Sequence, residues 1–141
     1  MSPKPPQQIV VITQEALKNE SFQEHTVYDL FFNSDRFKSI FFTKTERAVE
    51  KIFLLLEKTE SGFLPVVILN FPQFEQNIIA IEKIRSPKNP VFQKIPVLAI
   101  NWQFDCERRI KLLDATIDLL VDVPVVRALL IAQIDSFHRS C

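Results

Sequence analysis

Short apolar runs without polar alternation are the feature that most constrains how this chain can fold. The run VVILN, residues 66–70, places four aliphatic residues in a row before it reaches an asparagine. A strand of this kind must be covered on both faces, because neither face carries the polar residues that water requires. Four other segments resemble it, so the predicted strands are residues 9–13, 39–43, 66–70, 95–101 and 116–122.

A segment with helical spacing of apolar residues follows each of these runs. In TERAVEKIFLLLEK, for example, Thr45 can cap a helix whose apolar stripe includes Ala48, Ile52 and Leu55. The predicted helices are one that ends near Asn33 and those at residues 45–58, 73–85, 105–115 and 125–139. Strands that alternate with helices predict an α/β fold, a doubly wound five-stranded parallel sheet with helices on both faces.

The length and the charge of the chain limit the number of domains and the classes of partner to be expected. A chain of 141 residues is expected to form one domain, here residues 8–139 after a proline-rich lead-in at residues 1–7. Seventeen basic residues balance seventeen acidic ones, so no nucleic-acid partner is expected. No apolar run approaches the roughly 20 residues that span a bilayer, so no membrane partner is expected either.

The residue types that are scarce also exclude some functions. The N-terminus MSPKPPQQ has no apolar segment typical of a secretory signal, and Cys106 and Cys141 have no metal or redox spacing. We therefore expect free thiols and a cytoplasmic protein. Gly62 is the only glycine, and neither glycine-rich nucleotide motif occurs, which argues against phosphate-cradling loops.

Ligands of doubly wound sheets bind at the carboxyl ends of the strands, so the residues there are the candidate site. In this chain the strands end at Thr13 and Gln14, Thr43, Asn70, Asn101 and residues 121–124. The candidate site consists of Thr13, Gln14, Asn70, Asn101 and Val123. One interpretation of the two asparagines is a polar pocket that holds a ligand or a fixed hydrogen-bond network. The other is that asparagine simply satisfies local backbone groups where strands end.

Several local patterns resemble the receiver domain of two-component response regulators. PVVILN is similar to the third strand of that family, IPVLAIN to its fourth strand, and ATIDLLVDVP to its fifth strand. AIEKIRSPKNPVFQKIPV is similar to the third helix and the loop that follows it. The resemblance covers residues 9–137 and implies a flavodoxin-like sheet with the strand order 2-1-3-4-5.

The residues that carry the chemistry of the receiver family are absent. In that family an aspartate on the third strand accepts a phosphoryl group, and an acidic pair after the first strand helps to hold Mg²⁺. Here these positions hold Asn70 and the pair Thr13 and Gln14. Asn101 replaces the hydroxyl residue of the fourth strand, and no lysine lies between Leu119 and Val126. We expect no phosphorylation, no Mg²⁺ or other cofactor, and no enzymatic activity.

The last helix has a broader apolar surface than one sheet face can cover. The expected inward stripe contains Val126, Leu130, Ile134 and Phe137; Val125, Leu129 and Ala132 widen it, and Ile131 lies nearly opposite. This breadth indicates either tolerated exposure or a dimer or partner surface, as receiver-like proteins often have there.

In the preceding helix Ile110 and Leu113 are expected to point inward. Arg108 and Arg109 form a solvated face of that helix. The candidate interface residues are Arg108, Val125, Leu129 and Ile131.

The resemblance and the departures together predict a stand-alone pseudo-receiver that docks onto a protein. A histidine kinase, another regulator and a second copy of this chain are the candidate partners. One alternative is a small-molecule sensor that uses the vacated strand-end pocket. The other is a working phosphoacceptor with displaced acids, for which Glu15 and Glu75 lie closest in sequence.

Overall fold

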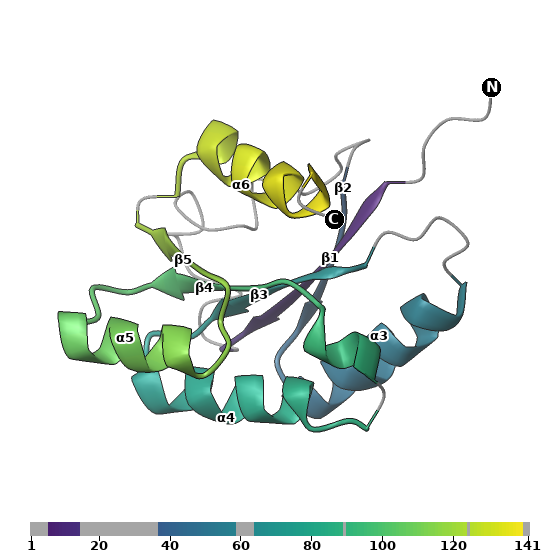
Figure 1. Cartoon of the computed structure of the whole chain (residues 1–141), viewed down its shortest axis with the longest axis horizontal. Helices are drawn as coiled ribbons and strands as arrows, with labels where there is room; N and C mark the ends of the chain where they lie inside the picture. Colours follow the sequence, from purple (N-terminus) through teal and green to yellow (C-terminus); the bar gives the residue numbers. More distant parts are fainter. Residues whose placement is uncertain (1–5, 15–36, 59–63, 89, 124, 140–141) are drawn as a thin grey trace.

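A five-stranded parallel sheet forms the centre of the molecule (Figure 1). The computed structural model describes residues 6–14, 37–58, 64–88, 90–123 and 125–139. The strands, in chain order, are β1 (Gln7–Thr13), β2 (Phe37–Phe42), β3 (Val66–Asn70), β4 (Val97–Asn101) and β5 (Leu119–Asp122). Their spatial order is β2-β1-β3-β4-β5, which confirms the predicted fold class and strand order.

Helices cover both faces of this sheet. Those in the described part of the chain are α3 (Thr45–Lys58), α4 (Phe74–Arg85), the short 3-10 helix η2 (Pro90–Gln93), α5 (Cys106–Asp114) and α6 (Arg127–Arg139). Figure 1 shows α6 on one face and α3, α4 and α5 on the other. The predicted helix that ends near Asn33 lies outside the described residues. No described helix has the length and apolarity that crossing a membrane requires.

Alternate residues of the central strands fill two separate cores. Val10, Val67 and Leu69 belong to the core beneath α3, α4 and α5. Ile9 and Ile68 belong to the core beneath α6. All of them are fully buried, which explains why these strands show no polar alternation.

The faces of the last two helices differ in part from the sequence prediction. In α5, Leu112 is buried, whereas Ile110 is 53% exposed and Leu113 is 47% exposed, so the inward assignment of those two residues is wrong. A helix of nine residues has too few turns for its apolar pattern to define one inward face. Here the single buried residue sets the orientation, and its two apolar neighbours remain in solvent.

In α6, Leu130 and Ile134 are buried as predicted, but Val126 is 58% exposed. Val125 is buried, so its assignment to an exposed interface is also wrong. The reason is that α6 begins only at Arg127, so the two valines precede the helix and do not follow its periodicity. Ile131, expected on the outer face, is half-buried and packs against the core beneath α6.

A partly buried arginine joins several segments where the strands begin. One terminal nitrogen of Arg85, at the end of α4, donates to the backbone oxygens of Phe92 (2.7 Å) and Ile95 (2.8 Å). The other donates to the backbone oxygen of Thr116 (2.9 Å) and lies 3.4 Å from the Asp118 carboxylate. Burial lowers the pKa of Arg85, while the Asp118 carboxylate acts in the opposite direction. Arg85 thus fixes the segments that lead into β4 and β5.

Candidate functional site

Asn70, at the carboxyl end of β3, uses both ends of its side chain in hydrogen bonds. It is fully buried. Its Nδ2 donates to the hydroxyl of Thr13 (3.2 Å), and its Oδ1 accepts from the indole Nε1 of Trp102 (2.9 Å). Thr13 is its direct partner in the parallel ladder between β1 and β3, and this register is what brings the two side chains together. The centre of the strand-end site is therefore a paired amide.

A tight turn after β4 places Trp102 over this amide. The Oδ1 of Asn101 accepts from the backbone N–H of Phe104 (2.9 Å), which closes the turn locally. Gln103 has a φ of 62°, a left-handed conformation that is uncommon for residues other than glycine. The Nδ2 of Asn101 donates to the carboxylate of Asp122 at the end of β5 (3.1 Å). Asn101 thus both shapes the turn and links it to the neighbouring strand.

The chemical groups at the centre of this site are neutral. An amide, a hydroxyl and an indole can donate and accept hydrogen bonds, but none of them is ionised near pH 7. A carboxylate enters only at Asp122, which is exposed and is hydrogen-bonded to Asn101 at the margin of the site. Within the described ranges, no three histidine, cysteine, aspartate or glutamate side chains form a group that could hold a metal ion.

The structure gathers some of the predicted site residues and separates others. Thr13, Asn70 and Asn101 lie at one edge of the sheet, and the Thr13 hydroxyl also approaches the backbone oxygen of Gln14 (3.4 Å). Val123 is half-buried and packs against the core beneath α6. For the displaced-acid alternative, Glu75 is exposed in the first turn of α4, and Glu15 lies outside the described residues.

The sequence prediction missed Trp102 and Asp122. Trp102 is the only tryptophan of the chain and directly follows a predicted strand end, so its position was a usable signal. Asp122 is the last residue of β5 and pairs in the ladder with Asn101. Both residues complete the strand-end network, which spans β1, β3, β4 and β5.

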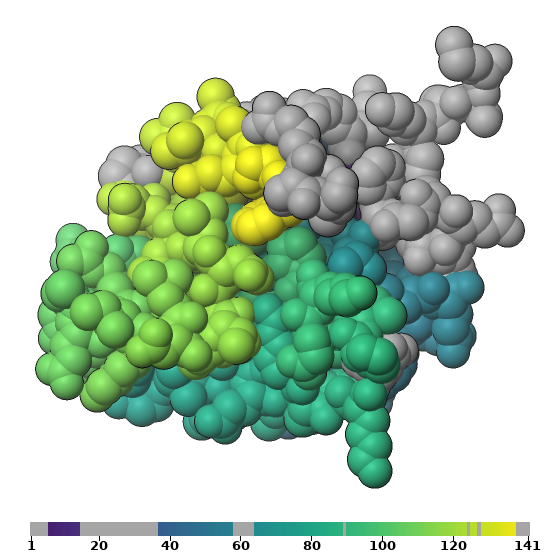
Figure 2. Space-filling view, viewed as in Figure 1, coloured from purple at the N-terminus to yellow at the C-terminus, as the bar shows by residue number. Residues whose placement is uncertain are grey.

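A groove of about 330 Å³ lies beside this network, at the β5 edge of the sheet. It is lined by Asn101, Cys106, Arg109, Ile110, Leu113, Leu120 and Asp122. The exposed apolar residues of α5 therefore border a hollow. Figure 2 shows α5, β5 and α6 as neighbouring parts of one side of the molecular surface. Arg108 is exposed on α5, and Leu129 is 57% exposed on α6.

Known proteins resemble this chain in fold. No family model matches the chain, and no curated protein matches it. A crystal structure assigned as a response regulator from Chloroflexus aurantiacus superposes with a TM-score of 0.65 at 12% identity. The receiver domain of a sensor histidine kinase from Pseudomonas aeruginosa, with magnesium coordinated in its active-site cleft, superposes with a TM-score of 0.62 at 16% identity. Each alignment covers 94% of this chain and 97% of the other.

Proposed function

We propose that this protein is a receiver-like module of two-component signalling that recognises a protein partner and does not accept a phosphoryl group. One observation supports the proposal most strongly. Asn70 stands where the receiver family has its acceptor aspartate, and both polar atoms of its buried side chain are already hydrogen-bonded. A receiver without its acceptor can act only by binding, so this arrangement favours recognition over catalysis.

The chemistry of the strand-end groups argues against phosphoryl transfer and against a resident metal. A carboxamide is uncharged, and its nitrogen donates hydrogen bonds, so it is no counterpart of the carboxylate that attacks phosphorus. Mg²⁺ prefers carboxylate and water oxygens in an octahedral arrangement. Here the amide oxygen accepts from Trp102, and Thr13 has a neutral hydroxyl. These side-chain atoms are poor ligands for magnesium, and we expect no magnesium site here.

Treatment with acetyl phosphate and Mg²⁺ tests the loss of phosphoryl transfer. Intact-protein mass spectrometry should show no added phosphoryl group on the wild type. The variant Asn70→Asp should also remain unmodified, because a single restored carboxylate supplies neither the acidic pair nor the lysine of the family. A phosphoryl adduct on the wild type would contradict the proposal and would favour the displaced-acid alternative. A small molecule retained through purification would instead favour the sensor alternative.

The β5 edge is the surface that we propose for docking. Ile110 and Leu113 on α5 and Leu129 on α6 are each about half exposed or more. The groove between α5 and β5 gives this edge a hollow that an apolar side chain of a partner can fill, and Arg109 adds a positive rim. The partner would be a histidine kinase, another regulator or a second copy of this chain in the cytoplasm.

Introducing a negative charge on this edge tests the docking surface. Ile110→Glu and Leu129→Glu should abolish self-association in light scattering, or the capture of a defined kinase or regulator, without lowering the melting temperature. Leu54→Glu is the matched control, because Leu54 is 48% exposed on α3, on a different part of the molecule. Equal loss of binding in all three variants would contradict the assignment of this surface. Ile131 is unsuitable for the test, since it packs partly against the core.

A further inference from the structure

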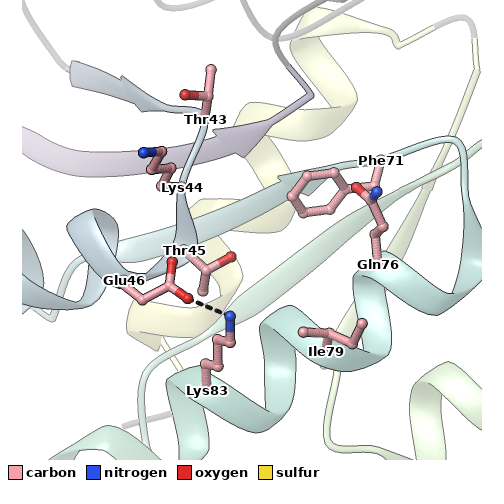
Figure 3. A pocket seen from close by; sticks show the side chains of 8 residues that line it. All are labelled: Thr43, Lys44, Thr45, Glu46, Phe71, Gln76, Ile79 and Lys83. Atoms are coloured by element: carbon pink, nitrogen blue, oxygen red, sulfur yellow. Dashed lines mark hydrogen bonds and ion pairs between the residues drawn. The ribbon is translucent and has the colours of Figure 1, made fainter.

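We propose that a groove at the N-terminus of α3 binds a small oxyanion of the phosphate type. The groove has a volume of about 280 Å³ and lies between the segment after β2, the first residues of α3 and one side of α4 (Figure 3). It is separate from the strand-end network, because neither Asn70 nor Trp102 lines it. The inference does not depend on the proposed function.

The start of α3 supplies backbone donors at this groove. The first helical bond runs from the N–H of Ala48 to the backbone oxygen of Lys44 (3.3 Å), so the N–H groups of residues 45–47 precede the helical ladder. The backbone N–H of Glu46 lowers the pKa of the Glu46 carboxyl, so one of these donors already faces a negative group. The remaining donors, with the dipole of a 14-residue helix behind them, favour a negative group.

A threonine inside the groove, mostly buried as a residue but with its hydroxyl open to the groove, is the second observation. Thr45 is only 9% exposed, and Figure 3 shows its side chain directed into the groove. Its hydroxyl has no hydrogen-bond partner within the described part of the chain. The Thr45 hydroxyl can donate to an oxygen of a ligand, and Gln76 supplies an amide on the facing wall.

The charges around the groove favour an anion but also limit its affinity. Lys44 and Lys83 bring two ammonium groups, and Glu46 brings one carboxylate. Glu46 and Lys83 form an ion pair across the groove, and the hydrogen bond from Lys83 lowers the pKa of Glu46. The ionised Glu46 therefore competes with an arriving anion for Lys83 and for the helix N-terminus. Removal of this carboxylate should strengthen binding, which a site of other chemistry would not show.

Apolar side chains at one end of the groove extend the expected ligand. Phe71 and Ile79 line it beside Gln76 (Figure 3), and Ile79 is 50% exposed. A phosphate ester with an apolar substituent could place its charge at α3 and its apolar part on these residues. Inorganic phosphate and phenyl phosphate are therefore the two probes. Tighter binding of phenyl phosphate would identify an ester as the ligand, and equal binding would identify free phosphate.

The test is a titration of the ¹⁵N-labelled protein with each probe, followed through the backbone amides of residues 44–47. The wild type should show saturable shifts. Thr45→Val should weaken binding about tenfold, the effect of one hydrogen bond to a charged group, and Thr45→Ser should retain it. Glu46→Gln should strengthen binding about two- to fivefold, the range of an exposed ion pair. Lys44→Gln should weaken it, and Lys51→Gln on the same helix should not.

Glu50→Gln is the matched control for Glu46→Gln. Glu50 is exposed one turn further along α3 and pairs with Arg47, so this variant changes the net charge equally without changing the groove. If both variants bound the probe equally more tightly, the effect would come from the net charge alone, and the proposal would be overturned. It would also be overturned if neither the wild type nor Glu46→Gln showed saturable shifts, or if Thr45→Val, folded by its amide spectrum, bound as the wild type does.

Discussion

The starts and the ends of the parallel strands carry chemically different side chains. At the edge where the strands begin, Arg85 places a charged guanidinium among backbone oxygens and beside Asp118. At the edge where the strands end, Asn70, Thr13 and Trp102 form an uncharged network. Both sets are hydrogen-bonded, but Asp118 is exposed, whereas Asn70 and Thr13 are fully buried. They differ in that the first joins the connecting segments, whereas the second pairs side chains with one another.

This difference shows where the protein uses a partly buried charged pair. Asp118 accepts from the backbone N–H of Val97 as well as from Arg85, so the charged cluster fixes the starts of β4 and β5. The strand ends are where doubly wound sheets place their ligands, yet their centre is neutral here. Within the described residues, the partly buried Arg85 is paired at the starts of the strands, where its role is structural.

Loss of the Arg85 side chain should give the largest effect on stability. Arg85→Ala leaves the backbone oxygens of Phe92, Ile95 and Thr116 without their donor and removes the partner of Asp118. We expect the free energy of unfolding to fall by about 2–4 kcal/mol, because three hydrogen bonds from a charged donor are lost at a site that is only partly shielded from solvent. Denaturant unfolding measures this loss. Arg47→Ala is the control, since Arg47 lies in solvent. A similar loss of stability in both variants would show that the contacts of Arg85 make no special contribution.

Loss of the indole donor should have a smaller effect at the other edge. Trp102→Phe keeps an aromatic ring but leaves the Oδ1 of the buried Asn70 without a partner. The expected decrease in the free energy of unfolding is about 1–3 kcal/mol, the cost of an unsatisfied buried polar group. Thermal or denaturant unfolding provides the measurement. A decrease as large as that of Arg85→Ala would show that the neutral network is as important for stability as the charged cluster.

The exposed ion pair of the carboxyl edge should have the smallest effect. Lys83 lowers the pKa of Glu46 through a hydrogen bond, so this carboxylate stabilises the fold above its unfolded pKa. That contribution is lost as the pH falls through the lower folded pKa. Lys83→Gln should return the pKa of Glu46 towards its ordinary value and remove this acid dependence. NMR titration of the Glu46 carboxyl would detect the change, and an unchanged pKa would show that Lys83 is not the cause.

The strands and the longer helices could be predicted because their patterns are local. The predicted ranges of β3 and α3 match the structure at both ends. A short continuous apolar run indicates a buried strand, and a long amphipathic stripe indicates a helix. The faces of α5 were predicted wrongly, because nine residues define a stripe poorly. Val125 and Val126 were misassigned because the start of α6 was placed too early.

The candidate site could be predicted only in part. Thr13 and Asn70 were expected together, because parallel strands end at one edge and the register aligns these two residues. The contact of Trp102 with Asn70 depends on a left-handed Gln103, which sequence patterns do not specify. The groove at α3 likewise depends on Lys83 reaching Glu46, a residue 37 positions earlier in the chain.

The indole N–H of Trp102 gives the most direct test of the central claim, which is that the strand-end network is closed to phosphoryl chemistry. Its NMR resonance reports the hydrogen bond to Asn70, and the chain has no other tryptophan. During titration with Mg²⁺ followed by beryllofluoride, a mimic of the phosphoryl group, we expect this resonance and the backbone amide of Asn70 to remain in place. A saturable, Mg²⁺-dependent shift of both signals would contradict the claim.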